Sequence, residues 1–193
     1  MNKKTVALST EQYEQIIDVI RTGYPGTEER PGLRPNDRVA VALVLEANLG
    51  VRIGDILKLT LASFIRDGSR YRLDIVEEKT EKRRTFTVPF PIYQYVENYC
   101  LRNNIRKNER ILPISSRTVQ SILKMACDFL GYEGISTHSF RKYYATEIYR
   151  ANGHDILLVQ HLLQHSSATV TQKYIGLDSK QVEEAILNHM KLL

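Results

Sequence analysis

Strand-like alternation of apolar and polar residues is confined to one stretch of this chain, residues 63–88, and this limits the fold to one small sheet. Three segments within it alternate with a period of two and are separated by turn sequences: Phe64–Arg66, Tyr71–Val76 and Arg84–Val88. Connections this short join antiparallel neighbours. Because the rest of the chain has helical periodicity, we predict an α+β fold, a mainly α-helical single domain with a small three-stranded antiparallel β-sheet.

Helical segments flank the predicted sheet on both sides. Ser9–Gln12 has the sequence of a capping box and begins the first helix. Residues 23–35 are rich in proline and glycine and predict a loop, after which Asn36 or Asp37 caps an apolar helix that Gly50 ends. The predicted helices cover residues 10–21, 39–49, 90–104, 116–131, 137–151, 154–164, 167–174 and 179–191, with a further short helix that begins near residue 52.

Length and composition exclude several classes of protein. The 193 residues suffice for one well-packed domain, and 42% hydrophobic with 25% charged residues is ordinary for a globular protein. Two cysteines are too few for a disulfide scaffold and favour a reducing, cytosolic compartment. No apolar run in the sequence is long enough to span a bilayer. A net charge of +5 is compatible with nucleic-acid binding but is weak support by itself.

A histidine and an arginine, His138 and Arg141, lie three residues apart in the C-terminal third of the chain. On a helix this spacing puts both side chains on one face, about 5–6 Å apart at Cβ. Taken alone, the pair is equally well explained as part of a solvated surface. Thr137 can cap this helix, however, and would then put the pair in the first turn, where free N–H groups and the helix dipole attract anions. This context favours a phosphate site.

A second arginine, Arg52, lies far upstream in the apolar setting Leu49-Gly-Val-Arg-Ile-Gly-Asp55. These neighbours imply a partly buried side chain, and a buried guanidinium needs a partner. Asp55, three residues later, is available. Two interpretations stay open: an Arg52–Asp55 pair that merely secures a turn, or an Asp55 that orients a phosphate-binding Arg52.

Two further features carry weaker signals. Lys79 lies in a charge run of the predicted hairpin, and although such runs are usually solvated turns, a lysine there could protonate a leaving oxygen as a general acid. His161 and His165 have the spacing of a metal-binding pair, but no third ligand stands at a recognisable distance, so we predict no metal. Neutralisation of phosphate charge would then fall to arginine and lysine.

Tyr174, nine residues after His165, is the candidate nucleophile. Any one of the eleven tyrosines is by default a packing residue. Tyr174 differs because it ends a polar segment, residues 166–173, that gives little hydrophobic reason for a tightly packed position. A hydroxyl nucleophile, guanidinium groups and imidazoles are together what phosphoryl transfer through a covalent intermediate requires.

In their order along the chain, these segments resemble the catalytic domain of tyrosine recombinases, the phage integrase family. The resemblance covers roughly residues 6–185. Four segments match the first-arginine box, the β-hairpin lysine segment, the His-x-x-Arg box, and the segment with the second histidine and the nucleophile: Gly50–Leu59, Glu78–Pro89, Thr137–Thr146 and Val159–Tyr174. In one departure from the family pattern, Gln164 stands before the second histidine where glycine is usual.

The resemblance implies how a DNA phosphate would be held. Arg52 and Arg141 would bind the two non-bridging oxygens of the scissile phosphate, and His165 would add a hydrogen bond. Asp55 would orient a neighbouring group and would not react itself. No metal and no other cofactor is implied, because the arginines supply the positive charge.

The resemblance also implies how the reaction would proceed. Tyr174 would attack phosphorus and form a 3′-phosphotyrosyl link, while Lys79 would protonate the departing 5′-hydroxyl. His138 would assist proton transfer at the tyrosine. Because bond energy is kept in the phosphotyrosine, no ATP is required, and a 5′-hydroxyl from another strand reverses the step.

The expected organisation also follows from the resemblance. Residues 1–193 would form the catalytic domain alone, without the N-terminal core-binding domain that full-length integrases usually carry. The expected partners are double-stranded DNA, further copies of the chain in a tetramer on DNA through the amphipathic segment 179–193, and accessory DNA-bending proteins. The expected location is the cytoplasm of a bacterial or phage-derived system, at the nucleoid and not at a membrane.

The function implied is therefore site-specific DNA recombination in integration, excision or inversion of DNA. Three alternatives stay open: a type IB topoisomerase with the same chemistry, a DNA-binding protein that no longer cleaves, and a metal-dependent nuclease. The second is disfavoured because every catalytic position is filled. The third is the weakest, because the sequence has no recognisable set of metal ligands.

Overall fold

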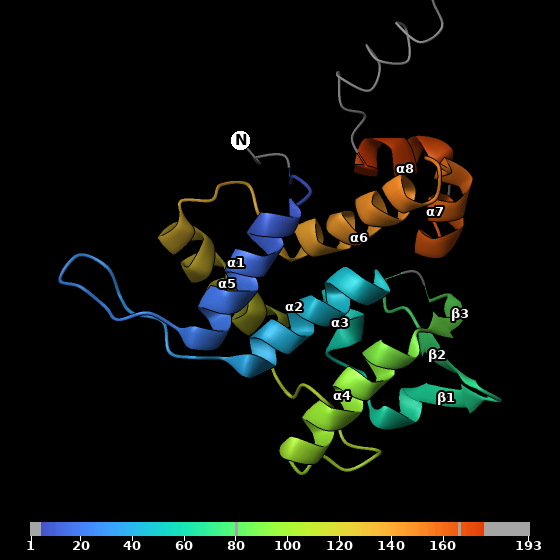
Figure 1. The fold of residues 1–193 in the computed structure, drawn as a ribbon, viewed down its shortest axis with the longest axis horizontal. Coiled ribbons are helices and arrows are strands. Elements are labelled where there is room, and N and C mark those ends of the chain that lie inside the picture. Colours follow the sequence, from blue (N-terminus) through green and yellow to red (C-terminus); the bar gives the residue numbers. More distant parts are fainter. Residues whose placement is uncertain (1–4, 80, 166, 176–193) are drawn as a thin grey trace, which may run out of the picture. The chain divides into compact units, whose positions relative to one another are not determined.

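The computed structural model describes residues 5–79, 81–165 and 167–175 (Figure 1). The chain forms two compact units, Met1–Tyr144 and Ala145–Leu193. The first unit contains the sheet and the helices up to residue 144, and the second contains the end of the helix that spans residues 137–151 together with the last two described helices. The predicted fold, mainly α-helical with one three-stranded antiparallel sheet, is confirmed.

Local capping signals set the ends of the first two helices. α1 (Thr10–Thr22) begins after Ser9, whose side chain accepts the Gln12 N–H at 3.1 Å, while the Gln12 side chain accepts the Ser9 N–H at 3.0 Å. α2 (Asp37–Leu49) begins after Asn36, whose side chain accepts the Val39 N–H at 3.1 Å. Gly50 ends α2 in the left-handed conformation at φ +58°. Both predicted helix starts are confirmed, with Asn36 as the cap of α2.

The core of the first unit is built around α2. Almost every residue from Val39 to Leu49 is buried, because this helix is apolar on all sides and has no face to leave in water. α1 and α5 (Ser116–Leu130) pack against α2 and against each other. α5 turns Val119, Leu123 and Ala126 toward this core at helical spacing. The three helices thus form the apolar base of the unit.

The predicted loop between α1 and α2 is present, and hydrogen bonds hold its two ends together. Tyr24 and Leu33 form an isolated β-bridge, with N–H···O distances of 2.9 Å in both directions. The Tyr24 ring stacks on Phe129 with ring centroids 4.1 Å apart, and the Tyr24 hydroxyl donates to the Met125 carbonyl at 3.2 Å. The loop is therefore attached to α5 at its base.

The sheet lies between α2 and α5 in the sequence. η1 (Leu61–Ser63) leads into β1 (Phe64–Asp67), β2 (Arg70–Val76) and β3 (Arg83–Val88), which pair antiparallel in the order β1-β2-β3. Leu73 at the centre pairs with Phe64 on one side and Phe86 on the other, so large apolar side chains share one face. α4 (Phe90–Arg102) packs on β2 (Figure 1), where the Tyr93 ring stacks on Tyr71 with centroids 3.6 Å apart.

The last described helices are α6 (Thr137–Ala151), α7 (Ile156–Leu163) and α8 (Ala168–Ile175). Asp155 caps α7, because its Oδ1 accepts the N–H groups of Leu157 at 2.9 Å and Leu158 at 3.0 Å. α7 and α8 pack against each other. The helix predicted over 179–191 lies outside the described residues. Within the described residues, no helix has both the length and the apolar character needed to cross a membrane.

One predicted helix cap is wrong by a residue. Thr137 is the first residue of α6, and Ser136 stands before it: the Ser136 N–H donates to Ser139 Oγ at 3.1 Å, and the Ser139 N–H donates to the Ser136 carbonyl at 2.9 Å. Adjacent hydroxyl residues can each cap a helix, so the sequence did not separate them. His138 is therefore the second residue of α6, and Arg141 is the fifth, just beyond the first turn.

Candidate active site

Arg52 lies at the N-terminal boundary of a single helical turn, α3 (Ile53–Ile56), directly after the Gly50 turn. Its side chain is 26% exposed, so the guanidinium remains accessible from one side. Nη1 of Arg52 donates to Oε2 of Glu77 at 2.5 Å. The partner of Arg52 is thus a carboxylate at the end of β2 and not Asp55, which corrects the predicted pairing.

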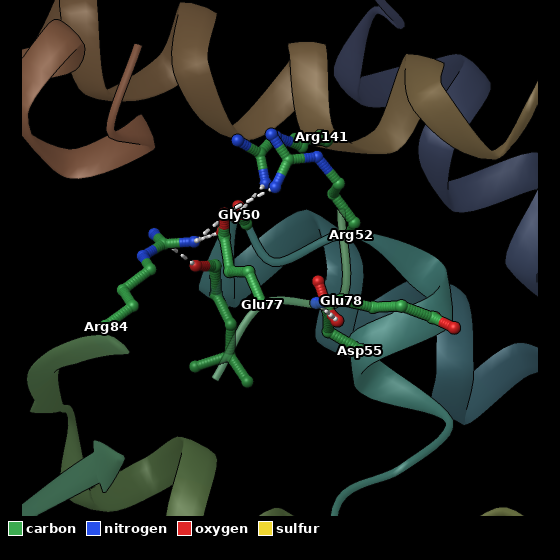
Figure 2. A network of polar contacts seen from close by, with 8 residues as sticks. Gly50, Arg52, Asp55, Glu77, Glu78, Arg84 and Arg141 are labelled. Atoms are coloured by element: carbon green, nitrogen blue, oxygen red, sulfur yellow. Dashed lines mark hydrogen bonds and ion pairs between the residues drawn. The ribbon is translucent and has the colours of Figure 1, made fainter. Parts of the chain in front are cut away.

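Arg141 meets the same carboxylate from a different element. It extends from α6, is 1% exposed, and places Nη1 3.9 Å from Oε1 of Glu77 (Figure 2). The two arginines that the family resemblance predicts to bind one phosphate are therefore brought together, although 89 positions separate them in the chain. Glu77, itself 1% exposed, lies between them and contacts both.

A third arginine, Arg84, completes this cluster and was missed in the sequence. Its Nη1 lies 3.5 Å from Oε1 of Glu77 and donates to the Gly50 carbonyl at 3.1 Å, and its guanidinium stacks over the Phe86 ring at 4.5 Å (Figure 2). Burial, followed by the charge of Arg141, lowers the pKa of Arg84 to about 10. The signal was present in the alternation of β3, which puts Arg84 on the same face as Phe86 and Val88.

A buried acidic residue, Glu46 of α2, interacts with the charge of Arg141 and was also missed. It is 1% exposed, and burial raises its pKa well above the usual value although the charge of Arg141 and the Ile53 N–H lower it. Oε2 of Glu46 is buried with no hydrogen-bond partner among the described residues. A carboxyl in such a setting binds a proton more readily than one in water.

Asp55 connects the first-arginine segment to the hairpin. Its side chain is buried, and Oδ1 accepts the Glu78 N–H at 2.9 Å (Figure 2). The Glu78 side chain is exposed and pairs with Lys58 at 3.0 Å. Asp55 therefore holds the backbone directly before Lys79, which is an orienting role of a different kind from the predicted one.

Lys79 follows in the turn between β2 and β3, and its side chain is exposed. The turn is closed at its base by hydrogen bonds from the Glu77 N–H to the Lys82 carbonyl at 3.0 Å and from the Glu81 N–H to the Glu77 carbonyl at 2.8 Å. His138 is likewise exposed, near the N-terminus of α6. Both residues are accessible to a large ligand such as DNA.

The second unit holds the other two candidates. His165 lies between α7 and α8, and its Nδ1 is 3.1 Å from the hydroxyl of Thr171 in α8. Its backbone is fixed as well, because the His165 N–H donates to the Gln160 carbonyl at 3.1 Å. Tyr174 is a residue of α8, one helical turn after Thr171. The Thr171 contact therefore ties the histidine to the helix that carries the tyrosine.

Gln164 takes the left-handed conformation at the end of α7, with φ +52°. A glycine adopts this conformation without steric cost, which gives a physical reason for the glycine that the family usually has there. Within the described residues no group of three His, Cys, Asp or Glu side chains could hold a metal ion.

The cluster in the first unit has the electrostatics of an anion site. The three guanidinium groups of Arg52, Arg84 and Arg141 surround one carboxylate within 3.9 Å, which leaves a net charge of +2 if Glu46 is neutral. Guanidinium groups bind phosphate oxygens through charge-assisted hydrogen bonds, and these are stronger where water is excluded. This charge favours a phosphate next to Arg52, the partly exposed guanidinium of the three, and would stabilise further negative charge that develops on it.

The chain is similar in sequence to known proteins. The model of the phage integrase family matches residues 7–181. The probable integrase/recombinase YoeC of Bacillus subtilis is 31% identical over 161 residues, 79% of this chain and 85% of YoeC. The tyrosine recombinase XerA of Pyrococcus furiosus is 27% identical over 190 residues, 93% of this chain and 60% of XerA.

A solved structure has the same fold. The XerH site-specific recombinase, bound to a palindromic difH substrate in a post-cleavage complex, superposes with a TM-score of 0.69 at 20% identity. The match covers 96% of this chain and 53% of the XerH chain. The family predicted from the order of the sequence segments is confirmed by the family match. This chain belongs to the phage integrase family.

Proposed function

We propose that this protein is a site-specific DNA recombinase that cleaves and rejoins DNA strands through a 3′-phosphotyrosyl intermediate, in integration, excision or inversion of DNA. The observation that carries the proposal is the convergence of Arg52 and Arg141 on one buried carboxylate. Family membership supports the same reading, since the relatives named above are recombinases and integrases.

In the proposed first step the phosphate is bound and polarised. Arg52 and Arg141 donate hydrogen bonds to the two non-bridging oxygens of the scissile phosphate, and His165 donates a further one. Each contact strengthens as negative charge grows on those oxygens, so the arginines stabilise the transition state more than the ground state. Arg84 contributes positive charge from beneath the site without touching the DNA.

In the proposed second step one P–O bond forms and another breaks. The Tyr174 hydroxyl loses its proton, with help from His138, and its oxygen attacks phosphorus. The bond from phosphorus to the 5′-oxygen breaks, and Lys79 supplies the proton that turns this oxygen into a free 5′-hydroxyl. Attack by a 5′-hydroxyl from another strand on the phosphotyrosine restores the tyrosine and joins the new strands.

The proposed partners follow from the reaction. Double-stranded DNA is the substrate, and exchange between two sites requires several copies of the chain, for which we propose a tetramer that uses segment 179–193. Accessory DNA-bending proteins would bring the sites together. We further propose that the protein acts in the cytoplasm of a bacterial or phage-derived system, at the nucleoid.

Formation of a covalent adduct tests the proposal. DNA sequences that bind the full chain are selected from a randomised duplex pool, rebuilt with a nick near the candidate scissile phosphate, incubated with protein, and separated on a denaturing gel. We expect an adduct with the wild type and with Tyr149→Phe, a control tyrosine whose ring makes an edge-to-face contact with His154, and none with Tyr174→Phe.

Three outcomes would overturn the proposal. The first is selected DNA that binds tightly but gives no adduct, which would indicate a protein that only binds DNA. The second is an adduct that persists in Tyr174→Phe, which would assign the nucleophile elsewhere. The third is relaxation of a supercoiled plasmid without the selected site, which would indicate a type IB topoisomerase instead.

A further inference from the structure

We propose that Glu77 is a positioning residue for strand cleavage: its carboxylate sets the spacing of Arg52 and Arg141, while its backbone closes the loop that carries Lys79. The inference rests on the proposed function and extends it to a residue with no role in the predicted mechanism. Glu77 would touch neither the DNA nor the reacting atoms, and would act through the groups that do.

The first support is how the two carboxylate oxygens are used. Oε2 accepts from Arg52 at 2.5 Å, while Oε1 faces Arg84 at 3.5 Å and Arg141 at 3.9 Å. One oxygen of the Glu77 carboxylate therefore binds Arg52, and the other oxygen faces Arg141. Because Glu77 is 1% exposed, packing around it restricts its rotation, and the distance between the two guanidinium groups is restricted with it.

The second support is the backbone of the same residue. The Glu77 N–H donates to the Lys82 carbonyl at 3.0 Å, and the Glu77 carbonyl accepts the Glu81 N–H at 2.8 Å. Lys79 lies in the loop that these bonds close, two residues after Glu77. One residue thus fixes the base of the lysine loop with its main chain and the arginine pair with its side chain.

The third support is charge. Arg52, Arg84 and Arg141 would repel one another in a buried cluster if no anion lay between them. With Glu77 ionised and Glu46 neutral, the cluster keeps a net charge of +2, which can balance the charge of a phosphodiester and part of the charge that develops in the transition state. A second ionised carboxylate would weaken phosphate binding, and a cluster without any would push the arginines apart.

A simpler explanation is that Glu77 only neutralises Arg84. Arg84 has other anchors, since it donates to the carbonyls of Gly50 at 3.1 Å and Leu49 at 3.5 Å and stacks over Phe86. The double variant Glu77→Gln with Arg84→Gln separates the explanations, because it removes one negative and one positive charge. Under both explanations the double variant should be more stable than Glu77→Gln alone. The spacing of Arg52 and Arg141 should recover in it only if neutralisation of Arg84 is all that Glu77 does.

The experiment compares Glu77→Gln, Glu77→Asp, the double variant and the matched control Glu78→Gln, whose side chain is 66% exposed on the same loop. The first readout needs no DNA: the ¹⁵N order parameter of the Arg52 Nε–H bond in the full chain. We expect it to fall below about 0.6, the range of flexible groups, in Glu77→Gln and in the double variant, and to stay at the wild-type value in Glu78→Gln.

The second readout is the single-turnover cleavage rate on the selected DNA. We expect a loss of about 100-fold in Glu77→Gln with little change in DNA affinity, because a shift of about 1 Å in a positioning group has this effect on rate. Glu77→Asp keeps the charge but shortens the side chain, so part of the rate should return. If Glu77→Gln does not fold, the aspartate and double variants carry the test.

The proposal is overturned if Arg52 keeps its wild-type order parameter in the folded Glu77 variants, or if the double variant cleaves at the wild-type rate. Failure of the proposed function gives a different pattern. In that case no variant and no wild-type sample cleaves DNA, while the order parameters still report whether Glu77 fixes Arg52.

Discussion

Replacement of Gly50 by alanine should destabilise the first unit more than an ordinary change at a helix end. Gly50 ends α2 at φ +58°, immediately before the segment that carries Arg52. A Cβ at this position would lie 2.5 Å from Cε1 of Tyr144 and closer still to Cδ1 of the same ring. The Gly50 carbonyl is also held by Arg84 at 3.1 Å, so the backbone cannot move away without loss of that contact.

The cost has two parts, which a control variant separates. The left-handed conformation costs an L-residue about 1–2 kcal/mol, from which the reduced entropy of the unfolded chain subtracts about 0.4–1 kcal/mol. The contact with the Tyr144 ring adds about 1–3 kcal/mol, the usual range for overpacking. Gly131 ends α5 at φ +74°, and apart from Gly131 and its two chain neighbours no described atom lies within 4 Å of the position that an alanine methyl group would take there, so Gly131→Ala should show the backbone part alone.

Urea unfolding of the full chain, followed by circular dichroism, measures both variants. We expect Gly131→Ala to lose about 1 kcal/mol of unfolding free energy and Gly50→Ala to lose about 2–4 kcal/mol. Equal losses would refute the reasoning, because they would show that the Tyr144 ring yields without cost. A smaller loss at Gly50 than at Gly131 would refute it more strongly.

Two further variants test single buried or strained groups. Because the pKa of Glu46 is raised in the folded state, its stabilising contribution is full below about pH 4.5 and is lost as pH rises toward the folded pKa. The free energy of unfolding of Glu46→Gln should therefore rise relative to that of the wild type across that pH window, by at most about 1.4 kcal/mol per pH unit. Urea unfolding at several pH values measures this, and a difference between the two midpoints that does not change with pH would contradict it. Gln164→Gly should raise the free energy of unfolding by about 1 kcal/mol, because glycine adopts φ +52° without the steric strain of a side chain. The change also removes a buried Oε1 that has no hydrogen-bond partner in the described part of the chain. A lower melting temperature than that of the wild type would contradict this prediction.

The elements of this fold could be predicted where their signals are local. Ser9 and Asn36 cap their helices through hydrogen bonds to residues three positions away, so the sequence alone contains both partners. The strands could be predicted because their period of two changes visibly from the surrounding helical period. The start of α6 was displaced by one residue because Ser136 and Thr137 are both residues that commonly precede a helix, and the sequence does not choose between them.

The contacts between site residues could not be predicted in the same way. Asp55 seemed the natural partner of Arg52 because it is three residues away, but α3 is a single turn and its carboxylate turns to the Glu78 N–H. The actual partner, Glu77, is 25 positions along the chain and reaches Arg52 because the hairpin folds back. Pairing of this kind depends on the packing of distant elements, and periodicity carries no information about it.

The arrangement of the hairpin has a consequence for the proposed reaction. A general acid must approach the leaving oxygen when DNA is bound, whereas the arginines must keep their geometry throughout. The hydrogen bond from the Glu77 N–H to the Lys82 carbonyl makes both possible, because it closes the base of the turn that carries Lys79. Movement of Lys79 can then be confined to the residues between Glu77 and Lys82. Glu77 itself is buried and pairs with Arg52 and Arg141, so under the proposed mechanism it would keep its place while the turn adjusts. If Glu77 has the positioning role proposed above, the residue that joins the lysine segment to the arginine cluster would also limit how far a motion of Lys79 disturbs that cluster.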